Sequence, residues 1–339
     1  MKVLVTGSSG FIGGYLVQHL LDEGYHVVGI DNHSKYGRVA RAHDDHPNYE
    51  FHEGDVKDVK FLKEIMSDCD QVVAGAAMIG GISYFHKYAY SLLAENERIL
   101  AATFDAAIWA FQNRGLKKIN VISSSMVFES TSVFPTPEGE QLTSPPPMST
   151  YGFQKLSSEY FAKGAWEQYG LPYTIIRPFN CVGVGESRAK GGEEVASGNI
   201  SLAMTHVVPD LIQKIARNQD PLHILGDGQQ VRAYTYAGDI ARGIRACIER
   251  EEATNEDFNI STPRATTAAE LAQIIWNKMR PGKPLSLIHD EPFKYDVQYR
   301  LPDVSKAAKM LDFRADTPLE EMLDEVIPWV EAQIKLGTI

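Results

Sequence analysis

Tyr151 and Lys155 are the pair of side chains whose types and spacing best suit chemistry on a hydroxyl group. They stand four residues apart at the start of a predicted helix and so share one face of it. A phenol, with a pKa of about 10, is a poor base near neutral pH, but a neighbouring ammonium group lowers that pKa. Ser124 follows a predicted strand, and its hydroxyl could position a substrate oxygen. These three candidate catalytic residues could remove a hydroxyl proton while hydride leaves the same carbon.

The Tyr–Lys spacing is weak evidence when taken alone. The chain has 15 tyrosines, so chance supplies about one such pair, and an exposed pair on a helix surface is the plain alternative. The pair gains weight from its place in an ordered set, which comprises a glycine turn, an acid, a serine at a strand end and then the pair itself. That set predicts a dehydrogenase-type site.

The glycine turn consists of Gly7, Gly10 and Gly13, between a predicted strand and a predicted helix. Missing side chains let the backbone approach a diphosphate, and the first helical residues, Phe11 and Ile12, offer free N–H groups at the positive end of the helix dipole. A plain strand-to-helix turn is the alternative. The position of the turn directly after a buried strand at the chain start favours dinucleotide binding.

Asp31 ends the second predicted strand, at the distance where an acid binds the hydroxyls of the adenosine ribose. A carboxylate accepts from two hydroxyls but repels a 2′-phosphate, so the predicted cofactor is NAD and not NADP. A solvated acid at a strand end is the alternative interpretation. The spacing from the glycine turn favours the cofactor role.

Short apolar segments alternate with helical patterns as far as Pro178, which predicts a doubly wound parallel sheet of the Rossmann type in an α/β protein. The predicted strands are Lys2–Thr6, His26–Ile30, Tyr49–His52, Gln71–Ala74, Lys118–Ser123 and Tyr173–Arg177. The predicted helices of this part are Phe11–Glu23, Val59–Met66, Ser91–Gln112 and Gly152–Tyr169.

The pattern changes after Pro178. A polar segment, Gly183–Asn199, is expected to be a functional loop or a disordered one. Further helices are predicted at Met204–Arg217, Gly238–Arg250, Ala268–Met279, Val304–Leu311 and Leu319–Lys335, with capping-box spacing at Thr267 and Glu270. We therefore expect an NAD-binding domain of residues 1–178 plus about 229–262, and a smaller mixed α/β substrate domain of about 179–228 and 263–339.

The amino-acid composition and net charge exclude several classes of binding partner. A net charge of −11 argues against nucleic acid and anionic membrane surfaces as partners, because both would be repelled. The three cysteines have no metal-ligand spacing, so no metal is predicted, and reduced thiols suit a cytoplasmic protein. No apolar stretch is long enough to span a membrane, and Met1-Lys2 leads directly into a predicted strand, which argues against a signal peptide.

The ordered set resembles the extended short-chain dehydrogenase/reductase family, in its nucleotide-sugar epimerase and dehydratase branch, over nearly the whole chain. Ser124 is aligned in preference to Ser125, because Val127-Phe128 match a Val–aromatic pair three residues after the family's serine. The resemblance implies NAD contacts from Asn32, which follows Asp31, from Asp55 and Val56 in a Gly-Asp-Val segment, from Ala76 and Ala77, and from Asn96, besides the turn and the Tyr–Lys pair.

The same resemblance implies three residues that bind the sugar diphosphate. Asn180 ends an Arg-Pro-Phe-Asn segment, Arg232 ends a Gly-Asp-Gly-x-Gln-x-Arg segment, and Arg300 begins an Arg-x-Pro-Asp segment. A forked guanidinium suits a diphosphate. Solvated arginines are the alternative for Arg232 and Arg300.

Ser125 and Met126 depart from the family's dehydratases and decarboxylases, which carry proton-transferring acids after the catalytic Ser or Thr. This departure favours reversible oxidation at carbon 4 of the sugar.

A second, local resemblance is to GDP-mannose 3,5-epimerases, in Met78-Ile79-Gly80-Gly81 and Lys190-Gly191-Gly192. It implies that Gly81, Ser125, Met126 and Lys190 line the sugar site, with Lys190 as an acid/base. The partner cysteine of those enzymes is Met126 here, and a loop lysine without a catalytic role is the alternative.

These observations predict an NAD-dependent nucleotide-sugar 4-epimerase, with a UDP-hexose as the default substrate. The alternatives are a related sugar-nucleotide enzyme (a 3,5-epimerase, a 4-keto-sugar reductase or a dehydratase) and, more remotely, a non-catalytic NAD-binding sensor. The resemblance also implies a homodimer formed by the helices near Ser91–Gln112 and Gly152–Tyr169.

Overall fold

The computed structural model describes residues 1–79, 88–186, 207–291 and 297–338. In these residues the larger lobe is built on a seven-stranded sheet in the order β3-β2-β1-β4-β5-β6-β11, and every neighbouring pair is parallel. The strands are β1 (Lys2–Thr6), β2 (His26–Asp31), β3 (Tyr49–Glu53), β4 (Gln71–Ala74), β5 (Lys118–Ile122), β6 (Tyr173–Pro178) and β11 (Glu256–Ile260). The order reverses between β1 and β4, which is where doubly wound folds bind their ligands. The predicted α/β Rossmann-type fold is confirmed.

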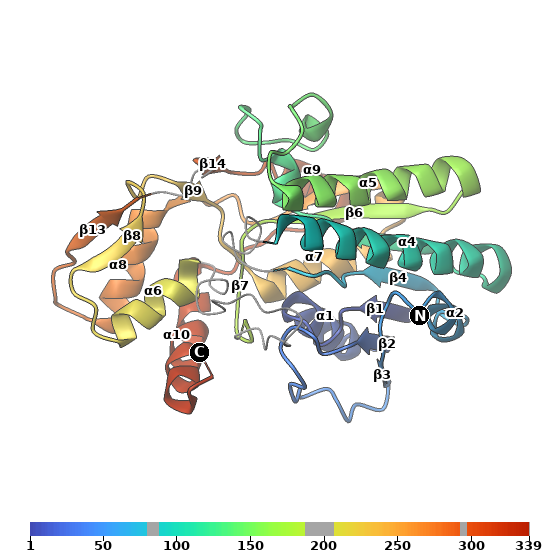
Figure 1. The fold of residues 1–339 in the computed structure, drawn as a ribbon, viewed down its shortest axis with the longest axis horizontal. Helices are drawn as coiled ribbons and strands as arrows, with labels where there is room; N and C mark the ends of the chain where they lie inside the picture. The colour runs from blue at the N-terminus through green and yellow to red at the C-terminus, as the bar shows by residue number, and fades with distance from the viewer. Residues whose placement is uncertain (80–87, 187–206, 292–296, 339) are drawn as a thin grey trace.

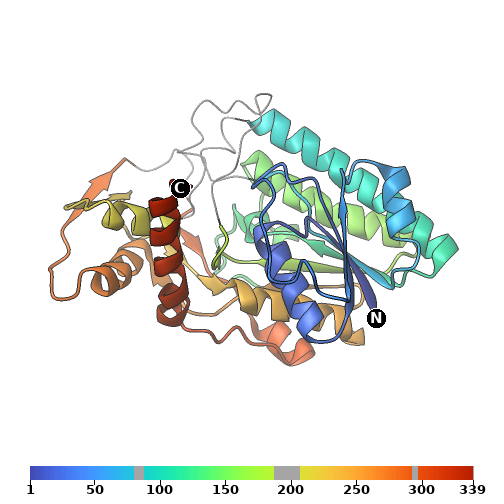
Figure 2. The same ribbon diagram turned by 90° about the horizontal axis from the view of Figure 1, so that it is seen from below.

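Helices cover both faces of this sheet (Figure 1). One core contains buried residues of α1 (Phe11–Asp22), α7 (Ala237–Glu249) and α9 (Ser305–Leu311). The opposite core contains those of α2 (Val59–Ile65), α4 (Ala89–Arg114) and α5 (Thr150–Tyr169). Figures 1 and 2 both show α4 and α5 side by side on the outside of the sheet.

Helix α5 begins where it does because Ser149 caps it. The Ser149 hydroxyl accepts from the Gly152 N–H at 3.0 Å and itself donates to the Glu129 carboxylate at 2.8 Å. Such caps satisfy N–H groups that a helix start leaves unpaired. The helix ends at Gly170, whose φ of 72° suits a left-handed cap. This cap fixes Tyr151 in the first turn and Lys155 one turn later.

The smaller lobe, at the left of Figure 1, has a core of its own. It is formed by α6 (Val207–Ala216), β8 (Leu222–Leu225), α8 (Ala268–Met279), β13 (Leu287–Asp290) and α10 (Leu319–Leu336). Short strands join the lobes, namely β7 (Cys181–Val182) with β10 (Thr235–Tyr236), and β9 (Val231–Arg232) between β12 (Thr266–Thr267) and β14 (Tyr299–Arg300). Short 3-10 turns lie at Ser125–Phe128, Glu140–Leu142 and Glu251–Ala253.

Most predicted elements are confirmed to within a few residues. The Thr267 hydroxyl accepts from the Glu270 N–H at 3.0 Å, as its capping spacing predicts. The predicted helix 204–217 is found as α6, and its residues 204–206 lie outside the described residues. Residues 187–199 of the predicted loop also lie outside them. The expected domain boundary differs at α9, which was assigned to the substrate domain. Its Ala307 and Leu311 pack in a core of the large sheet.

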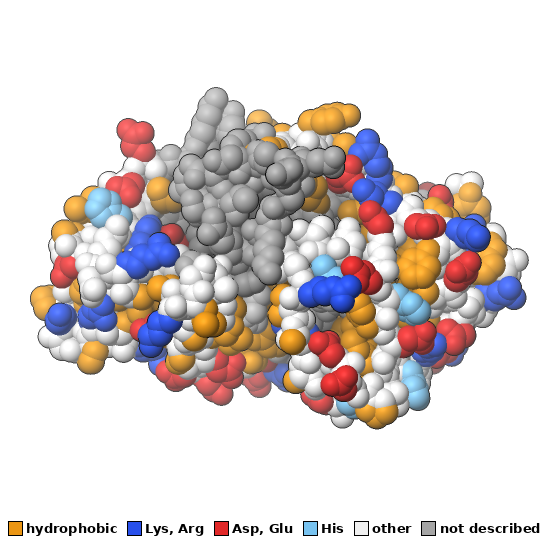
Figure 3. All heavy atoms as spheres, turned by 60° about the horizontal axis from the view of Figure 1, so that its bottom comes forward, with side chains coloured by type: hydrophobic (Ala, Val, Ile, Leu, Met, Phe, Trp, Pro, Cys, Tyr) orange, Lys and Arg blue, Asp and Glu red, His pale blue; other side chains and the backbone are white. Residues whose placement is uncertain are grey.

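No described helix is long and apolar enough to cross a membrane. On the face shown in Figure 3, acidic side chains gather along the lower edge of the molecule, whereas basic ones are scattered singly or in small groups. This distribution agrees with the net charge of −11.

A buried ion pair between Glu159 and Arg177 joins the elements that carry the candidate catalytic residues. The Arg177 Nε and Nη2 atoms donate to the two Glu159 oxygens at 2.7 and 2.8 Å, and both residues are at most 1% exposed. The same carboxylate accepts from the Ser123 hydroxyl at 2.7 Å, and Arg177 also pairs with Asp257 at 2.7 Å. One carboxylate on α5 thus connects the ends of β5 and β6.

Replacing Arg177 by Met is expected to lower the free energy of unfolding by about 3–5 kcal/mol, because Glu159 would stay buried without its counter-charge. Urea unfolding followed by circular dichroism measures this. Arg264→Met is the control, since Arg264 pairs with Glu320 in a partly exposed position, where a pair contributes about 1 kcal/mol or less. Equal losses in the two variants would contradict the special weight given to the buried pair.

Candidate active site

The glycine turn packs too closely for side chains at two of its glycines. Gly7 has a φ of 74°, and a Cβ there would lie 2.9 Å from the Ala76 Cα, at the end of β4. A Cβ on Gly13 would lie 2.1 Å from the Gly7 carbonyl oxygen. Contacts below 3.0 Å are not compatible with a side chain in place. The turn therefore closes against both its own helix α1 and the neighbouring strand, directly at the point where the strand order reverses.

Thr6 fixes the ends of β1 and β4 to each other. Its hydroxyl oxygen accepts from the N–H groups of Gly75 and Ala76, both at 3.1 Å. Thr6 is 1% exposed, and Ala76 was itself an expected cofactor contact, with Ala77 next to it. Sequence reasoning missed Thr6, although a hydroxyl residue between a buried apolar strand and a glycine turn was a usable signal.

Asp31 lies beside the glycine turn, as its spacing predicted. Its carboxylate oxygens accept from the N–H groups of Ser9 at 3.1 Å and His33 at 2.8 Å. This carboxylate is therefore held in place at the edge of the turn where a ribose could reach it.

The other expected cofactor contacts are divided between exposed and buried positions. Asn32 is exposed, whereas Asp55 is partly exposed and accepts from the Lys57 N–H at 2.9 Å. Asn96 is 1% exposed and both accepts from and donates to the backbone of Met78, at 2.7 and 2.9 Å. Val56 is buried in the core on the α2 side. Asn96 thus holds the segment that follows Ala76 and Ala77. This role does not require Asn96 itself to touch the cofactor.

The three candidate catalytic residues meet at the carboxyl end of β5. The Lys155 Nζ donates to the Ile122 carbonyl at 2.9 Å. The Ser124 hydroxyl accepts from the Met126 N–H at 3.2 Å, and it also forms a hydrogen bond with the Tyr151 phenol. All three side chains are buried. The structure therefore brings together residues that the sequence places 31 positions apart at most.

Burial dominates the acid–base properties of this group. Burial raises the pKa of Tyr151, while the hydrogen bond from Ser124 and the charge of Arg300 act in the opposite direction. Burial also lowers the pKa of Lys155 to about 8. Its Nζ is directed to the Ile122 carbonyl, so the lowering of the Tyr151 pKa by Lys155 stays a prediction. A further positive charge near the phenol is needed for Tyr151 to act as a base near neutral pH.

Apolar side chains surround the Tyr151 ring. Its cluster consists of Leu92 and Met126, with Met78, Ile79 and Tyr88 packed against them. Ser125 and Met126 are both buried at the start of the 3-10 turn that follows Ser124. Neither side chain can transfer a proton as a carboxylic acid does, which agrees with the expectation from the sequence.

Arg232 and Arg300 are direct partners in the parallel pairing of β9 with β14. Their charges both act on the buried Tyr234, and that of Arg300 also acts on Tyr151. Asn180, the third expected diphosphate contact, has a φ of 32° and donates to the Ala233 carbonyl at 3.4 Å. Arg232 and Arg300, from distant segments, thus bring two positive charges together near Tyr234. Gly81 and Lys190 lie outside the described residues.

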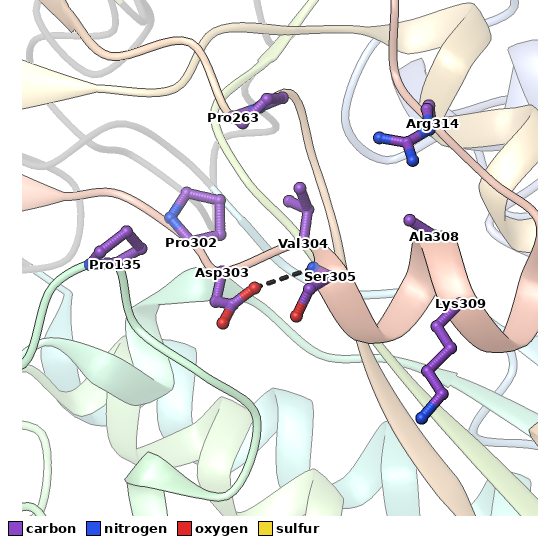
Figure 4. A pocket seen from close by; sticks show the side chains of 9 residues that line it. All are labelled: Pro135, Pro263, Pro302, Asp303, Val304, Ser305, Ala308, Lys309 and Arg314. Carbon is purple, nitrogen blue, oxygen red and sulfur yellow. Dashed lines mark hydrogen bonds between the residues drawn. The ribbon is translucent and has the colours of Figure 1, made fainter.

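A separate depression lies where β14 leads into α9 (Figure 4). Pro135, Pro263 and Pro302 line it, and Asp303 accepts from the Ser305 N–H at 2.8 Å. Its lining includes no expected site residue. In the described part of the chain, no group of three or more His, Cys, Asp or Glu residues could hold a metal ion.

A family model described as the NAD dependent epimerase/dehydratase family matches residues 3–261. The chain belongs to this family. The prediction of an NAD-dependent enzyme of the epimerase type is thereby confirmed, as is the resemblance to the nucleotide-sugar branch.

Individual relatives of this family cover almost the full chain. A putative UDP-glucose 4-epimerase of Methanocaldococcus jannaschii is 28% identical over 97% of this chain and 98% of its own. A solved UDP-glucose 4-epimerase of Thermotoga maritima, with UDP-glucose, is 28% identical, with a TM-score of 0.81 over 98% of this chain and 100% of its own. A UDP-N-acetylglucosamine 4-epimerase of Methanobrevibacter ruminantium, in complex with UDP-N-acetylmuramic acid, is 28% identical, with a TM-score of 0.82 over 98% of each chain.

Gly7→Ala is expected to abolish retention of NAD by this family member, because the new Cβ would meet the backbone of Ala76 at 2.9 Å. The measurement is mass spectrometry of the small molecules released on denaturing the purified protein. Gly24→Ala is the matched control. Gly24 also has a positive φ, of 81°, but a Cβ there meets nothing within 4 Å, so only a backbone cost of about 1–2 kcal/mol is expected. Retention of NAD by Gly7→Ala would contradict the role of this close approach.

Proposed function

We propose that the protein is a nucleotide-sugar 4-epimerase that works through a transient 4-keto sugar, with a UDP-hexose as substrate. The observation that carries this proposal is the buried Ser124–Tyr151–Lys155 group at the carboxyl end of β5, with Ser125 and Met126 in place of acids. The putative UDP-glucose 4-epimerase of M. jannaschii and the solved UDP-glucose 4-epimerase of T. maritima, each 28% identical to this chain, support the substrate class.

In this mechanism Tyr151 removes the proton of the sugar 4-hydroxyl, and Ser124 donates a hydrogen bond to the same oxygen. Bound NAD supplies the hydride acceptor and a positive nicotinamide ring. Because burial raises the pKa of Tyr151, the phenol needs a nearby positive charge before it becomes a base. Lys155 anchors the site through the Ile122 carbonyl and provides a second such charge when it is protonated.

Epimerisation requires the 4-keto sugar to turn over before hydride returns to its opposite face. Arg232 and Arg300 would hold the diphosphate during this rotation, since forked guanidinium groups bind phosphates strongly. The wall formed by Met126 and its apolar neighbours offers the ring few directional hydrogen bonds. A fixed diphosphate beside an apolar wall therefore favours rotation of the sugar without its release.

The alternative functions differ from 4-epimerisation in the chemical groups that they require. A 3,5-epimerase must remove carbon-bound protons next to a ketone, and Lys190, its expected acid/base, lies outside the described residues. A 4-keto-sugar reductase consumes one reduced cofactor per product. A dehydratase needs an acid where Met126 stands. A non-catalytic sensor needs none of the three buried catalytic side chains.

The deciding experiment is incubation of the purified enzyme with UDP-glucose in deuterated water, followed by proton NMR. We expect UDP-galactose with no deuterium on carbon, because the hydride leaves and returns within the site. Deuterium at carbon 3 or 5 would replace the proposal by the 3,5-epimerase. With added NAD, net formation of NADH and a 4-keto sugar would replace it by the reductase running in reverse. No turnover of any UDP-hexose would also contradict it.

The control is Tyr151→Phe, which keeps the ring but removes the base. Its kcat is expected to fall by about 10²–10⁴-fold, and measuring the bound NAD separates loss of the base from loss of the cofactor. Full activity in this variant would remove Tyr151 from the mechanism.

We also propose a homodimer formed by α4 and α5. Both helices expose large hydrophobic side chains, Tyr90 at 79% and Tyr160 at 60% of their surfaces. Light scattering after gel filtration is expected to give twice the chain mass of 37.7 kDa. Tyr160→Asp should shift this towards the monomer by placing a charge in an apolar interface. Leu142→Asp, at an exposed leucine outside both helices, is the control, and a monomeric native protein would contradict the proposal.

A further inference from the structure

Arg41 lies on the glycine turn although it belongs to the segment between β2 and β3. Its Nη2 atom donates to the carbonyl oxygens of Ser9 at 3.0 Å and Gly10 at 3.3 Å. Asp31 holds the N–H of the same Ser9 at 3.1 Å. An acid and an arginine thus bind the two sides of one peptide segment in the middle of the turn.

Two glycines make room for this guanidinium. A Cβ on Gly14, in the first turn of α1, would lie 2.9 Å from the Arg41 Cζ, and its next two contacts are the Nη atoms. A Cβ on Gly185, in the segment after β7, would lie 3.2 Å from the Arg41 Nη1. The chain therefore places the guanidinium between the start of α1 and the segment 183–186, and side chains at either glycine would displace it.

The Arg41 guanidinium lies beside the N-terminal end of α1. The N-terminal end of a helix carries a partial positive charge, and the first turn of α1 contains no acidic residue. Within the described ranges of the chain, no carboxylate forms an ion pair with the Arg41 guanidinium. The Asp44 carboxylate accepts only from the Arg41 backbone N–H, at 2.8 Å. The Arg41 Nε is buried and has no hydrogen-bond partner there.

We propose that Arg41 is a cofactor-binding residue, whose guanidinium binds a phosphate of the NAD diphosphate together with the N–H groups at the start of α1. An anion between the guanidinium and the helix end is attracted by both charges, and arginine is well suited to phosphate. The inference rests on the NAD dependence of the family and is independent of the proposed 4-epimerase activity, because its tests measure cofactor binding alone.

The first test compares Arg41→Met with Arg38→Met. Arg38 belongs to the same segment but is exposed and pairs with Glu53, so both variants lose one positive charge. NAD is measured as the amount retained after desalting the purified protein and as the dissociation constant on reloading. Arg41→Met is expected to raise that constant by about tenfold or more, as for loss of a charge-assisted contact. Arg38→Met should stay within about twofold. Equal affinities in the two variants would overturn the proposal.

A second test keeps the positive charge of Arg41 but shifts the position of its guanidinium. Gly14→Ala places a methyl group 2.9 Å from the Arg41 Cζ, so the guanidinium must shift, and alanine stabilises a helix relative to glycine. We expect a melting temperature equal to or above that of the native protein together with weaker NAD binding. A residue that only braced the turn would lose stability and affinity together. Native NAD affinity in Gly14→Ala, with the guanidinium displaced, would overturn the proposal.

The salt dependence of binding separates a phosphate contact from a structural one. The dissociation constant of NAD for the native protein should rise between about 0.05 and 0.5 M salt, because salt screens charge pairs. Arg41→Met should show a shallower rise, and Arg41→Lys, which keeps the charge, should recover the native slope. Identical slopes in the native protein and Arg41→Met would mean that Arg41 acts only on the shape of the turn.

Discussion

The buried carboxylate of Glu159 is the constraint that most of the catalytic geometry depends on. It lies on the face of α5 that also carries Lys155 one turn earlier, and it accepts from Ser123 at the end of β5 and from Arg177 near the end of β6. A charge taken out of water is tolerated only where partners replace its hydration. The register of α5 against the sheet is therefore set by electrostatics as much as by apolar packing, and the candidate catalytic residue Ser124 follows directly after Ser123.

The residues of the large sheet could be predicted from the sequence because they carry strong periodic signals. Buried parallel strands such as β1 and β5 are short apolar runs, and α1 shows an apolar stripe ended by a glycine. The small lobe was harder to predict, since strands of two residues such as β9 and β14 leave no pattern. Their pairing, which brings Arg232 beside Arg300, depends on contacts across 68 residues of sequence.

In the candidate site too, residues marked by a local sequence pattern could be predicted, whereas residues that act through distant contacts could not. The glycine turn, Asp31 and the Tyr–Lys pair are visible because their spacing along the chain reflects the chemistry. Thr6, Glu159 and Arg41 act through hydrogen bonds to groups that are remote in sequence or belong to the backbone. The local signals among them were the four-residue step from Lys155 to Glu159 on one helix face and the place of Thr6 between a buried strand and the glycine turn. Burial of Tyr151 and Lys155 could not be read from residue types.

The late position of β11 and α9 in the chain has a consequence for synthesis on the ribosome. β11 completes the edge of the large sheet at residues 256–260, and α9 adds Ala307 and Leu311 to a core that begins with β1. The glycine turn and helix α5 are thus translated long before the packing that completes their lobe. A nascent chain must hold that partly exposed apolar face until its last third emerges, a stage at which such surfaces are prone to aggregate or to recruit chaperones.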